Sequence, residues 1–379
     1  MTWDIFCSVI DNFGDIGVTW RLARQLADER RIPVRLWVDD LAAFRRIRPE
    51  IDPELATQTL AGVEVHRWTS PLPDMEPGEV VIEALACNLP DEFVARMAAR
   101  NPKPVWLNLE YLTAEDWAGG VHGLPSPHPR LPLAKFFFMP GYGPGSRGLT
   151  RESWLMERRN AFQADAEARA AFWAGLGLPG ERSGELRVSL FSYENAALPG
   201  LLGTWASSAR PLRVLVPVSK ALPEIGAWFG LDAQPEPGSR LARGALTLHV
   251  LPMLDQDDYD RLLWACDLNF VRGEDSFVRA QFAGRPMVWQ IYRQEEEAHF
   301  AKLEAFLDLY CADMDRKLAA LTRDAWRTWN RETGFGAFWP AWLDDLPALG
   351  RHAKMWCDHL ARQSDLASNL LIFCKKKLE

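Results

Sequence analysis

Two carboxylates stand close together in the segment that follows the first strand-like run of the chain. Residues 11–17 read DNFGDIG and occupy the place where a dinucleotide-binding protein carries its glycine loop, but the G-x-G-x-x-G pattern is absent. Negative charge at this point repels phosphate, so the pair Asp11 and Asp15 better suits a cation or a group that gives up a proton. One aspartate alone would favour a helix N-cap, whereas two favour a functional role.

A second polar group lies at 272–276, where a short apolar strand is expected to run into a helix. Helix N-termini bind phosphate through free N–H groups, and here Ser276 adds a hydroxyl and Arg272 a charged, bidentate donor. Glu274 and Asp275 have two open interpretations. They are either acids that stabilise the first helical turn by ~0.3–1 kcal/mol each, or carboxylates that reach the ribose hydroxyls of a nucleotide sugar.

A third candidate is the acidic run DQDD at 255–258, which also follows a strand-like segment. Asp255 and Asp257 have the spacing of a DxD motif that holds a divalent cation, but the run equally suits the start of a helix, and we favour the helix start. Side chains able to stack on a base, hydrogen-bond to it or cover the sugar follow this strand and an earlier one: Phe191, Tyr193, Gln256 and Tyr259.

Cysteines and histidines give no sign of a metal centre. The six cysteines form no CxxC pair and the seven histidines no HExxH motif. Most of the cysteines lie in apolar runs, which predicts reduced thiols in the core. Four tryptophans at helical spacing near the C-terminal end, at 326, 329, 339 and 342, are likewise expected in the core.

Strand-like and helical patterns alternate along the chain, which predicts parallel sheets covered by helices on both faces. The expected strands of the first half are 4–10, 34–38, 63–68, 80–84, 105–109 and 135–139, and the expected helices are 17–31, 41–47 and 91–100. After turn-rich segments the pattern restarts, with strands at 186–191, 212–218, 246–251, 268–271 and 287–291, and helices at 198–209, 257–266 and 276–283. Helical periodicity continues from 295 onward.

These patterns predict two facing α/β domains of the Rossmann-like type with a cleft between them, followed by C-terminal helices. We expect an N-terminal domain at 1–183 and a C-terminal domain at 184–354, with a helix at about 355–379 that packs back on the first domain. Ligands of such sheets bind beyond the carboxyl ends of the strands, so both domains are expected to direct loops into the cleft.

Length and charge exclude several classes of protein. The chain has 379 residues, which predicts two domains, and its 43 lysines and arginines against 51 aspartates and glutamates give a net charge of −8. That balance argues against a protein held on nucleic acid by a phosphate-neutralising surface. No apolar run approaches the ~20 residues of a membrane span, and the N-terminus lacks the basic region of a signal peptide. We expect a soluble, cytoplasmic protein.

Two long motifs resemble a known family. DNFGDIGVTWRLARQL at 11–26 and RGEDSFVRAQFAGRPMVWQIY at 272–292 are similar to the elongation factor P arginine rhamnosyltransferases, and so are SLFSYEN at 189–195 and LDQDDYDRLLWACD at 254–267. The resemblance implies a GT-B glycosyltransferase that moves rhamnose from dTDP-β-L-rhamnose, with inversion and without a metal or cofactor. The acceptor it implies is one arginine of elongation factor P, which is thereby activated to rescue ribosomes stalled at polyproline.

The resemblance also implies roles for individual residues. Asp11 and Asp15 match the acidic pair that faces sugar and acceptor, with Asp15 as the base, and Glu274 matches an essential glutamate. Asp275 and Ser276 match positions at the phosphates or ribose. The remaining matches are nucleotide-pocket positions: Tyr193, Gln256 and Tyr259. Met253 departs from an aromatic residue that stands there in some relatives.

Two other functions stay open from the residues alone. A different nucleotide-sugar transferase with a carbohydrate or small-molecule acceptor would share the second half of the chain, although a neutral hydroxyl acceptor needs one base rather than a pair of acids. A non-catalytic nucleotide-binding module that docks on the translation machinery would bind the sugar nucleotide without consuming it.

Overall fold

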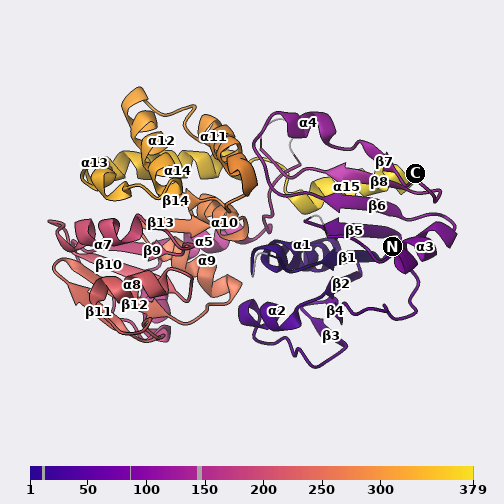
Figure 1. Ribbon diagram of the computed structural model, residues 1–379, viewed down its shortest axis with the longest axis horizontal. Helices are drawn as coiled ribbons and strands as arrows, with labels where there is room; N and C mark the ends of the chain where they lie inside the picture. Colours follow the sequence, from indigo (N-terminus) through magenta and orange to yellow (C-terminus); the bar gives the residue numbers. More distant parts are fainter. Residues whose placement is uncertain (11–12, 86, 143–146, 379) are drawn as a thin grey trace. The chain divides into compact units, whose positions relative to one another are not determined.

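The computed structural model describes residues 1–10, 13–85, 87–142 and 147–378, and the chain divides into two compact units (Figure 1). Unit 1 comprises residues 1–153 and 363–379, and unit 2 comprises residues 154–362. Each unit contains a mainly parallel sheet with helices packed on it, as the alternating sequence patterns predict. Of the helices in the described part of the chain, none has the length and apolarity that a membrane span requires.

Unit 1 is built on an eight-stranded sheet in the order β3-β4-β2-β1-β5-β6-β8-β7. The strands are β1 (Trp3–Cys7), β2 (Val34–Val38), β3 (Thr57–Leu60), β4 (Val63–Arg67), β5 (Val80–Ala84), β6 (Val105–Leu109), β7 (Pro125–Pro127) and β8 (Ala134–Phe138). The inner strands run parallel, and the edge strands β3 and β7 are antiparallel to their neighbours. The strand order reverses between β1 and β5, so the loop after β1 opens at a topological switch point, where such sheets bind ligands.

Helices cover both faces of this sheet: α1 (Gly14–Arg30), α2 (Leu41–Ile47) and α15 (Leu366–Leu378) on one, and α3 (Asp91–Ala99) on the other, with α4 (Trp117–Val121) following β6. Alternate residues of β1 point to opposite faces. Trp3 and Ile5 are buried in the core beneath α1, whereas Phe6 packs on the opposite face, stacked on Trp37 at 5.5 Å between ring centroids. Burial on both faces explains why β1 is an unbroken apolar run.

Unit 2 has a six-stranded sheet in the order β11-β12-β10-β9-β13-β14. Its strands are β9 (Leu186–Leu190), β10 (Leu212–Pro217), β11 (Arg240–Arg243), β12 (Leu246–Leu251), β13 (Leu268–Arg272) and β14 (Met287–Gln290). All pairs are parallel except β11 with β12. Here the order reverses between β9 and β13, so the loops after these two strands lie at the switch point of unit 2.

The helices of unit 2 are α5 (Leu155–Ala164), α6 (Ala166–Gly175), α7 (Leu198–Ala206), α8 (Leu222–Phe229), α9 (Gln256–Ala265), α10 (Asp275–Ala283), α11 (Ala298–Tyr310), α12 (Arg316–Asn330), α13 (Trp339–Asp344) and α14 (Leu346–Ala361), with short 3₁₀ turns at Glu295–Glu297 and Phe335–Phe338. The tryptophans at 326, 329, 339 and 342 are buried, which confirms their predicted place in the core. All six cysteines are free and buried, and burial raises the pKa of Cys87 to about 12 and that of Cys311 to about 11.

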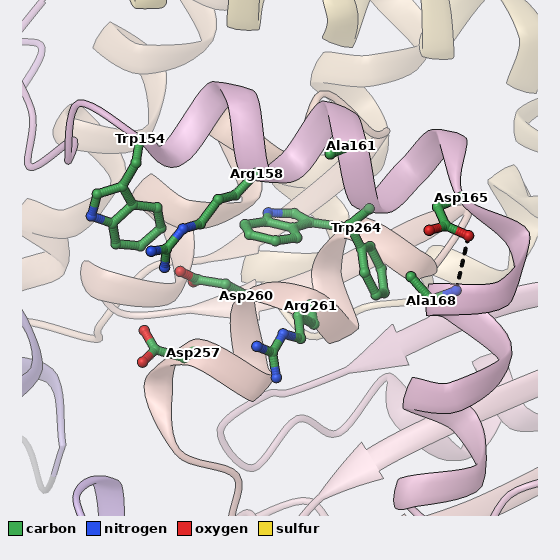
Figure 2. A pocket seen from close by; sticks show the side chains of 10 residues that line it. Trp154, Arg158, Ala161, Asp165, Ala168, Asp257, Asp260, Arg261 and Trp264 are labelled. Atoms are coloured by element: carbon green, nitrogen blue, oxygen red, sulfur yellow. Dashed lines mark hydrogen bonds between the residues drawn. The ribbon is translucent and has the colours of Figure 1, made fainter.

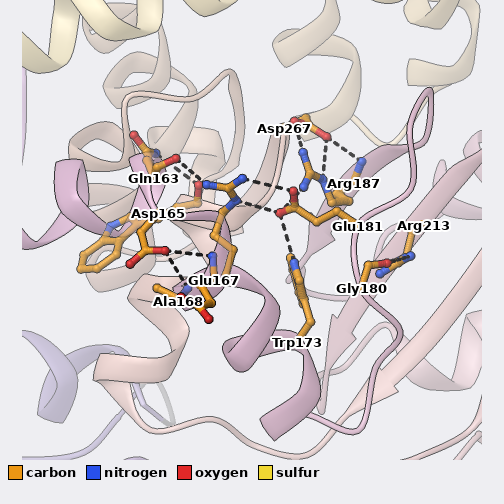
Figure 3. A network of polar contacts seen from close by, with 12 residues as sticks. Gln163, Asp165, Glu167, Ala168, Trp173, Gly180, Glu181, Arg187, Arg213 and Asp267 are labelled. Atoms are coloured by element: carbon orange, nitrogen blue, oxygen red, sulfur yellow. Dashed lines mark hydrogen bonds and ion pairs between the residues drawn. The ribbon is translucent and has the colours of Figure 1, made fainter.

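The division between the units falls before Trp154, whereas the sequence patterns place it at 183/184. Polar side chains attach helices α5 and α6 to unit 2: Gln163 Nε2 of α5 donates to the Trp264 carbonyl at 3.2 Å. Glu181, in the loop after α6, accepts a hydrogen bond from Trp173 Nε1 at 3.3 Å and pairs with Arg187 of β9 at 2.5 Å (Figure 3). The turn-rich composition of this loop therefore marks a connection inside unit 2 rather than a linker between units.

The C-terminal segment rejoins unit 1 from Gln363 onward, whereas the sequence predicts a returning helix at about 355–379. Its helix α15, yellow in Figure 1, contacts α1 and β6. Asp365, just before α15, accepts a hydrogen bond from Gln25 Nε2 at 3.1 Å and pairs with Arg30 at 3.2 Å, and both partners lie on α1. The residues at 355–361 instead complete α14 in unit 2.

Candidate functional site

Asp15 lies in the first turn of α1, directly after the switch point of unit 1. Its side chain is 2% exposed. Oδ2 accepts a hydrogen bond from the Ile10 N–H at 2.9 Å, and Oδ1 accepts one from the hydroxyl of Tyr111, just past β6, at 3.4 Å. The N-cap of α1 is Phe13, so Asp15 does not have the capping role that was its alternative. Asp11 lies outside the described residues.

A further carboxylate, which the sequence patterns did not single out as a site residue, supports the same loop. Asp39 follows β2, and its Oδ1 accepts a hydrogen bond from the Val9 N–H at 2.9 Å while Oδ2 accepts one from the Ser8 hydroxyl. The feature of the sequence that could have identified Asp39 is its position at the carboxyl end of a predicted strand, β2, which pairs with β1. The backbone after β1 is thus held by two carboxylates, Asp39 and Asp15.

Arg272, at the end of β13, is the centre of the candidate site in unit 2. Its guanidinium carbon lies 4.5 Å from the ring centroid of Phe191 and 4.4 Å from that of Tyr193, both of which follow β9. Phe191 in turn meets Tyr259 of α9 edge to face, with ring centroids 5.5 Å apart. Cation–π contacts and edge-to-face packing of this kind hold the three aromatic rings around a charged group.

Hydrogen bonds join the loops that carry these residues. Gln256 Nε2, in the first turn of α9, donates to Asp275 Oδ2 in the first turn of α10 at 3.1 Å. The main-chain N–H of Tyr193 donates to Gln290 Oε1 at 2.9 Å. The Ser276 hydroxyl donates to the main-chain carbonyl of Arg272 and accepts from its N–H at 3.1 Å, so it organises the turn between β13 and α10.

The structure therefore brings together seven residues that the sequence places in three separate segments: Phe191, Tyr193, Gln256, Tyr259, Arg272, Asp275 and Ser276. All lie at or after the carboxyl ends of β9, β12 and β13. Burial raises the pKa of the Tyr259 phenol well above its ordinary value, so this ring stays neutral at any working pH.

Glu274 is the N-cap residue of α10, but its side chain makes no capping hydrogen bond. Instead Glu274 Oε1 pairs with Lys302 Nζ, on α11, at 3.1 Å. Sequence reasoning missed Lys302, because it lies 28 residues away in a helix with no recognisable motif. Only the packing of α11 in unit 2 reveals its position beside this carboxylate.

The acidic run at 255–258 starts a helix, as we favoured. Asp255 caps α9 by accepting the Asp258 N–H at 2.7 Å, and Asp258 pairs with Arg261 at 2.7 Å. Asp257 faces a separate cavity of about 330 Å³ between α5 and α9, whose walls include Trp154, Arg158 and Trp264 (Figure 2). Within the part of the chain that is described, no three His, Cys, Asp or Glu side chains are grouped to hold a metal ion.

A cavity of about 290 Å³ opens at the ligand-binding edge of unit 2, beyond β9, β10 and β14. Residues in its walls include Tyr193, Lys220, Glu224, Gln290 and Tyr292. Burial raises the pKa of Glu224, with further contributions from the negative charges of Glu332 and Glu194. The cavity thus combines aromatic walls with both signs of charge, next to the cluster around Arg272.

Two Rossmann-like units with ligand-binding side chains at their switch points are the architecture of glycosyltransferases of the GT-B class, and the solved structures that this chain resembles have it. Solved structures of Acinetobacter baumannii MurG and of the spinosyn forosaminyltransferase SpnP share this fold, with TM-scores of 0.51 and 0.50 at 12% and 11% identity. A family model described as Elongation-Factor P (EF-P) rhamnosyltransferase EarP matches residues 3–375. The chain belongs to this family.

Relatives named for their activity match nearly the whole chain. Protein-arginine rhamnosyltransferases of Pseudomonas aeruginosa and Pseudomonas putida are 50% and 49% identical to it, over 98% and 100% of this chain and 98% and 99% of theirs. A solved structure described as the basis for EarP-mediated arginine glycosylation of translation elongation factor EF-P matches with a TM-score of 0.71 at 38% identity, covering 99% of both chains.

Proposed function

We propose that this enzyme transfers rhamnose from dTDP-β-L-rhamnose to an arginine side chain of elongation factor P, with inversion and without a metal ion. Unit 2 would bind the sugar nucleotide and unit 1 the acceptor arginine. The observation that carries the proposal is the convergence of residues from three strand ends on Arg272 in unit 2, in a chain that belongs to the EarP family along its length.

The cluster in unit 2 has the chemistry that a nucleoside diphosphate requires. Phe191 and Tyr193 offer faces on which a base or sugar can stack, and they hold the Arg272 guanidinium within reach of the same space. The first turn of α10 adds main-chain N–H groups and the positive end of the helix dipole. Arg272 and α10 together would stabilise the negative charge that grows on the departing diphosphate.

The acceptor presents a harder problem, because a guanidinium is protonated at any working pH and its lone pairs are delocalised. Carboxylates overcome both difficulties by binding the guanidinium through charged hydrogen bonds, fixing one nitrogen in place and restricting delocalisation. We propose Asp15, which is buried and hydrogen-bonded by Ile10 and Tyr111, as such a group, with Asp11 as its partner.

The reaction is a single displacement at the anomeric carbon. A bond forms between a guanidinium nitrogen and C1 of rhamnose, and the bond between C1 and the phosphate oxygen breaks, with its electron pair leaving on dTDP. The attacking nitrogen becomes acidic as its new bond forms, so Asp15 accepts the proton then and need not deprotonate free arginine. Attack opposite the leaving group converts the β-linked donor to an α-linked product. We propose that Glu274, in unit 2, also acts at the reacting centre.

Intact mass spectrometry of elongation factor P tests the proposal directly. After incubation with this enzyme and dTDP-β-L-rhamnose, we expect the partner to gain the mass of one deoxyhexose. Fragment spectra should place it on an arginine, and the coupling constant of the anomeric proton and carbon should report an α linkage. A partner in which that arginine is replaced by lysine is the matched control and should gain nothing.

The same assay separates the alternatives. Consumption of the sugar nucleotide without any mass gain on elongation factor P would indicate a different acceptor. Binding of dTDP-β-L-rhamnose without consumption, in the presence of the folded partner, would indicate a non-catalytic module. Either result would contradict the proposed activity.

A further inference from the structure

An ion pair places a lysine beside the acidic residue that opens α10. Lys302 Nζ lies 3.1 Å from Glu274 Oε1, and the two side chains are 16% and 15% exposed. Solvent screening is weak for a pair so largely shielded from water, so the pair restrains the conformation of Glu274 more than an ordinary surface pair would.

Both residues are attached to one packed core. Trp289 of β14 stacks on Phe277 of α10 with ring centroids 3.9 Å apart, and its Nε1 donates to the Gly273 carbonyl at 2.8 Å, which fixes the turn that carries Glu274. Phe306 of α11 packs edge to face on the same Phe277 at 4.7 Å.

Lys302 precedes Phe306 by one helical turn and therefore lies on the same side of α11. Anchoring of Phe306 on Phe277 thus presents Lys302 to the turn between β13 and α10. The packing of α11 on α10 therefore places the Lys302 ammonium beside Glu274, and no large rearrangement is needed to form the pair.

We propose that Lys302 is a positioning residue for the transfer reaction: it holds the Glu274 carboxylate in one orientation at the reacting centre. This inference rests on the proposed function, since it requires Glu274 to act in the transfer. Lys302 itself would contact neither substrate, so its loss should lower kcat through Glu274 and leave the binding of the sugar nucleotide nearly unchanged.

Steady-state kinetics of Lys302→Met and Lys302→Gln test this with elongation factor P as acceptor. We expect kcat to fall at least ~10-fold, while KM for dTDP-β-L-rhamnose changes less than ~3-fold. Lys302→Arg, which keeps the charge, should recover part of the loss. The matched control is Arg327→Met, which breaks another ion pair of α11. In that pair Arg327 donates two hydrogen bonds of 2.7 Å to the carboxylate of Glu304, a residue of α11. The Arg327→Met variant should keep wild-type kcat.

A double-mutant cycle with Glu274→Gln, measured under single-turnover conditions, gives the decisive readout. If Lys302 acts through Glu274, adding Lys302→Met to Glu274→Gln should cost little more than Glu274→Gln alone. The inference would be overturned if Lys302→Met lowered the rate equally in the wild-type and Glu274→Gln backgrounds, or if Arg327→Met lowered kcat as much as Lys302→Met does. It would also be overturned if a folded Lys302→Gln variant kept kcat within ~2-fold of wild type. A wild-type enzyme that leaves elongation factor P unmodified would refute the proposed function itself.

Discussion

Replacing Asp15 by asparagine separates the chemical role of this carboxylate from its structural one. Asparagine keeps the size of the side chain and one acceptor oxygen, which can still receive the Ile10 N–H that Asp15 Oδ2 receives at 2.9 Å. It removes the charge that binds a guanidinium and the basicity that accepts its proton. We therefore expect turnover to fall at least ~100-fold, the lower end of general-base effects, with little change in affinity for dTDP-β-L-rhamnose, which is assigned to unit 2.

The expected losses of stability and of activity differ enough to be distinguished. A hydrogen bond to a charged group contributes about 1.5–3 kcal/mol and one to a neutral group about 0.5–1.5 kcal/mol, so the substitution should lower the free energy of unfolding by about 1 kcal/mol. A ~100-fold loss of rate corresponds to ~2.7 kcal/mol of transition-state stabilisation. With a typical stability of about 5–15 kcal/mol, the variant stays folded, and unfolding cannot account for the lost activity.

The assay is the rate of deoxyhexose gain on elongation factor P, with urea unfolding of each variant measured alongside. Asp39→Asn is the matched control, because Asp39 holds the neighbouring Val9 N–H at the same 2.9 Å and has no proposed role in the chemistry. Because Asp39 is exposed, this variant should lose no more stability than Asp15→Asn, and it should keep turnover within a few-fold of wild type. Turnover by Asp15→Asn within a few-fold of wild type would remove Asp15 from the mechanism.

Three further predictions follow from unit 2 and its site. A fragment of residues 154–362 should bind dTDP in calorimetry. A fragment that starts at residue 184 should unfold more readily, because it lacks the fully buried Trp173 (0% exposed). A folded 154–362 fragment without affinity for dTDP would contradict the assignment of the sugar-nucleotide site to unit 2. Transfer should continue in excess EDTA, and a loss that magnesium restores would revive the DxD interpretation of Asp255 and Asp257. Arg279→Met should lower the free energy of unfolding in urea by ~3–5 kcal/mol, because it breaks a buried ion pair with Asp260 in which the two side chains are 1% and 2% exposed. A loss below ~1 kcal/mol would refute this.

The sequence predicts the fold and the gathering of the site in unit 2 because both follow from local patterns and one topological rule. Apolar runs separated by helical periodicity determine parallel sheets, and loops after neighbouring strands then share an edge. Phe191, Gln256 and Arg272 could be brought together on that basis without knowledge of any contact between them.

The features that the sequence could not supply depend on contacts between distant residues. A turn-rich segment looks the same in a linker and in a loop, and contacts such as the pairing of Glu181 with Arg187 assign it to unit 2. Nothing in the sequence around Lys302 indicates that packing presents it to Glu274. The edge strands β3, β7 and β11 were missed because they are short and largely exposed, so they lack the apolar runs of inner strands.

The return of the chain to unit 1 after residue 362 sets an order on its synthesis. A ribosome makes the whole of unit 2 before α15 exists, so unit 2 can fold while unit 1 still lacks one of its helices. Until then the face of the sheet that α15 covers stays open, and Leu366, Leu370 and Cys374 are missing from the core beneath α1. Because α1 carries Asp15, the proposed acceptor-binding carboxylate acquires its final support only after the part of the enzyme assigned to the sugar nucleotide has been made.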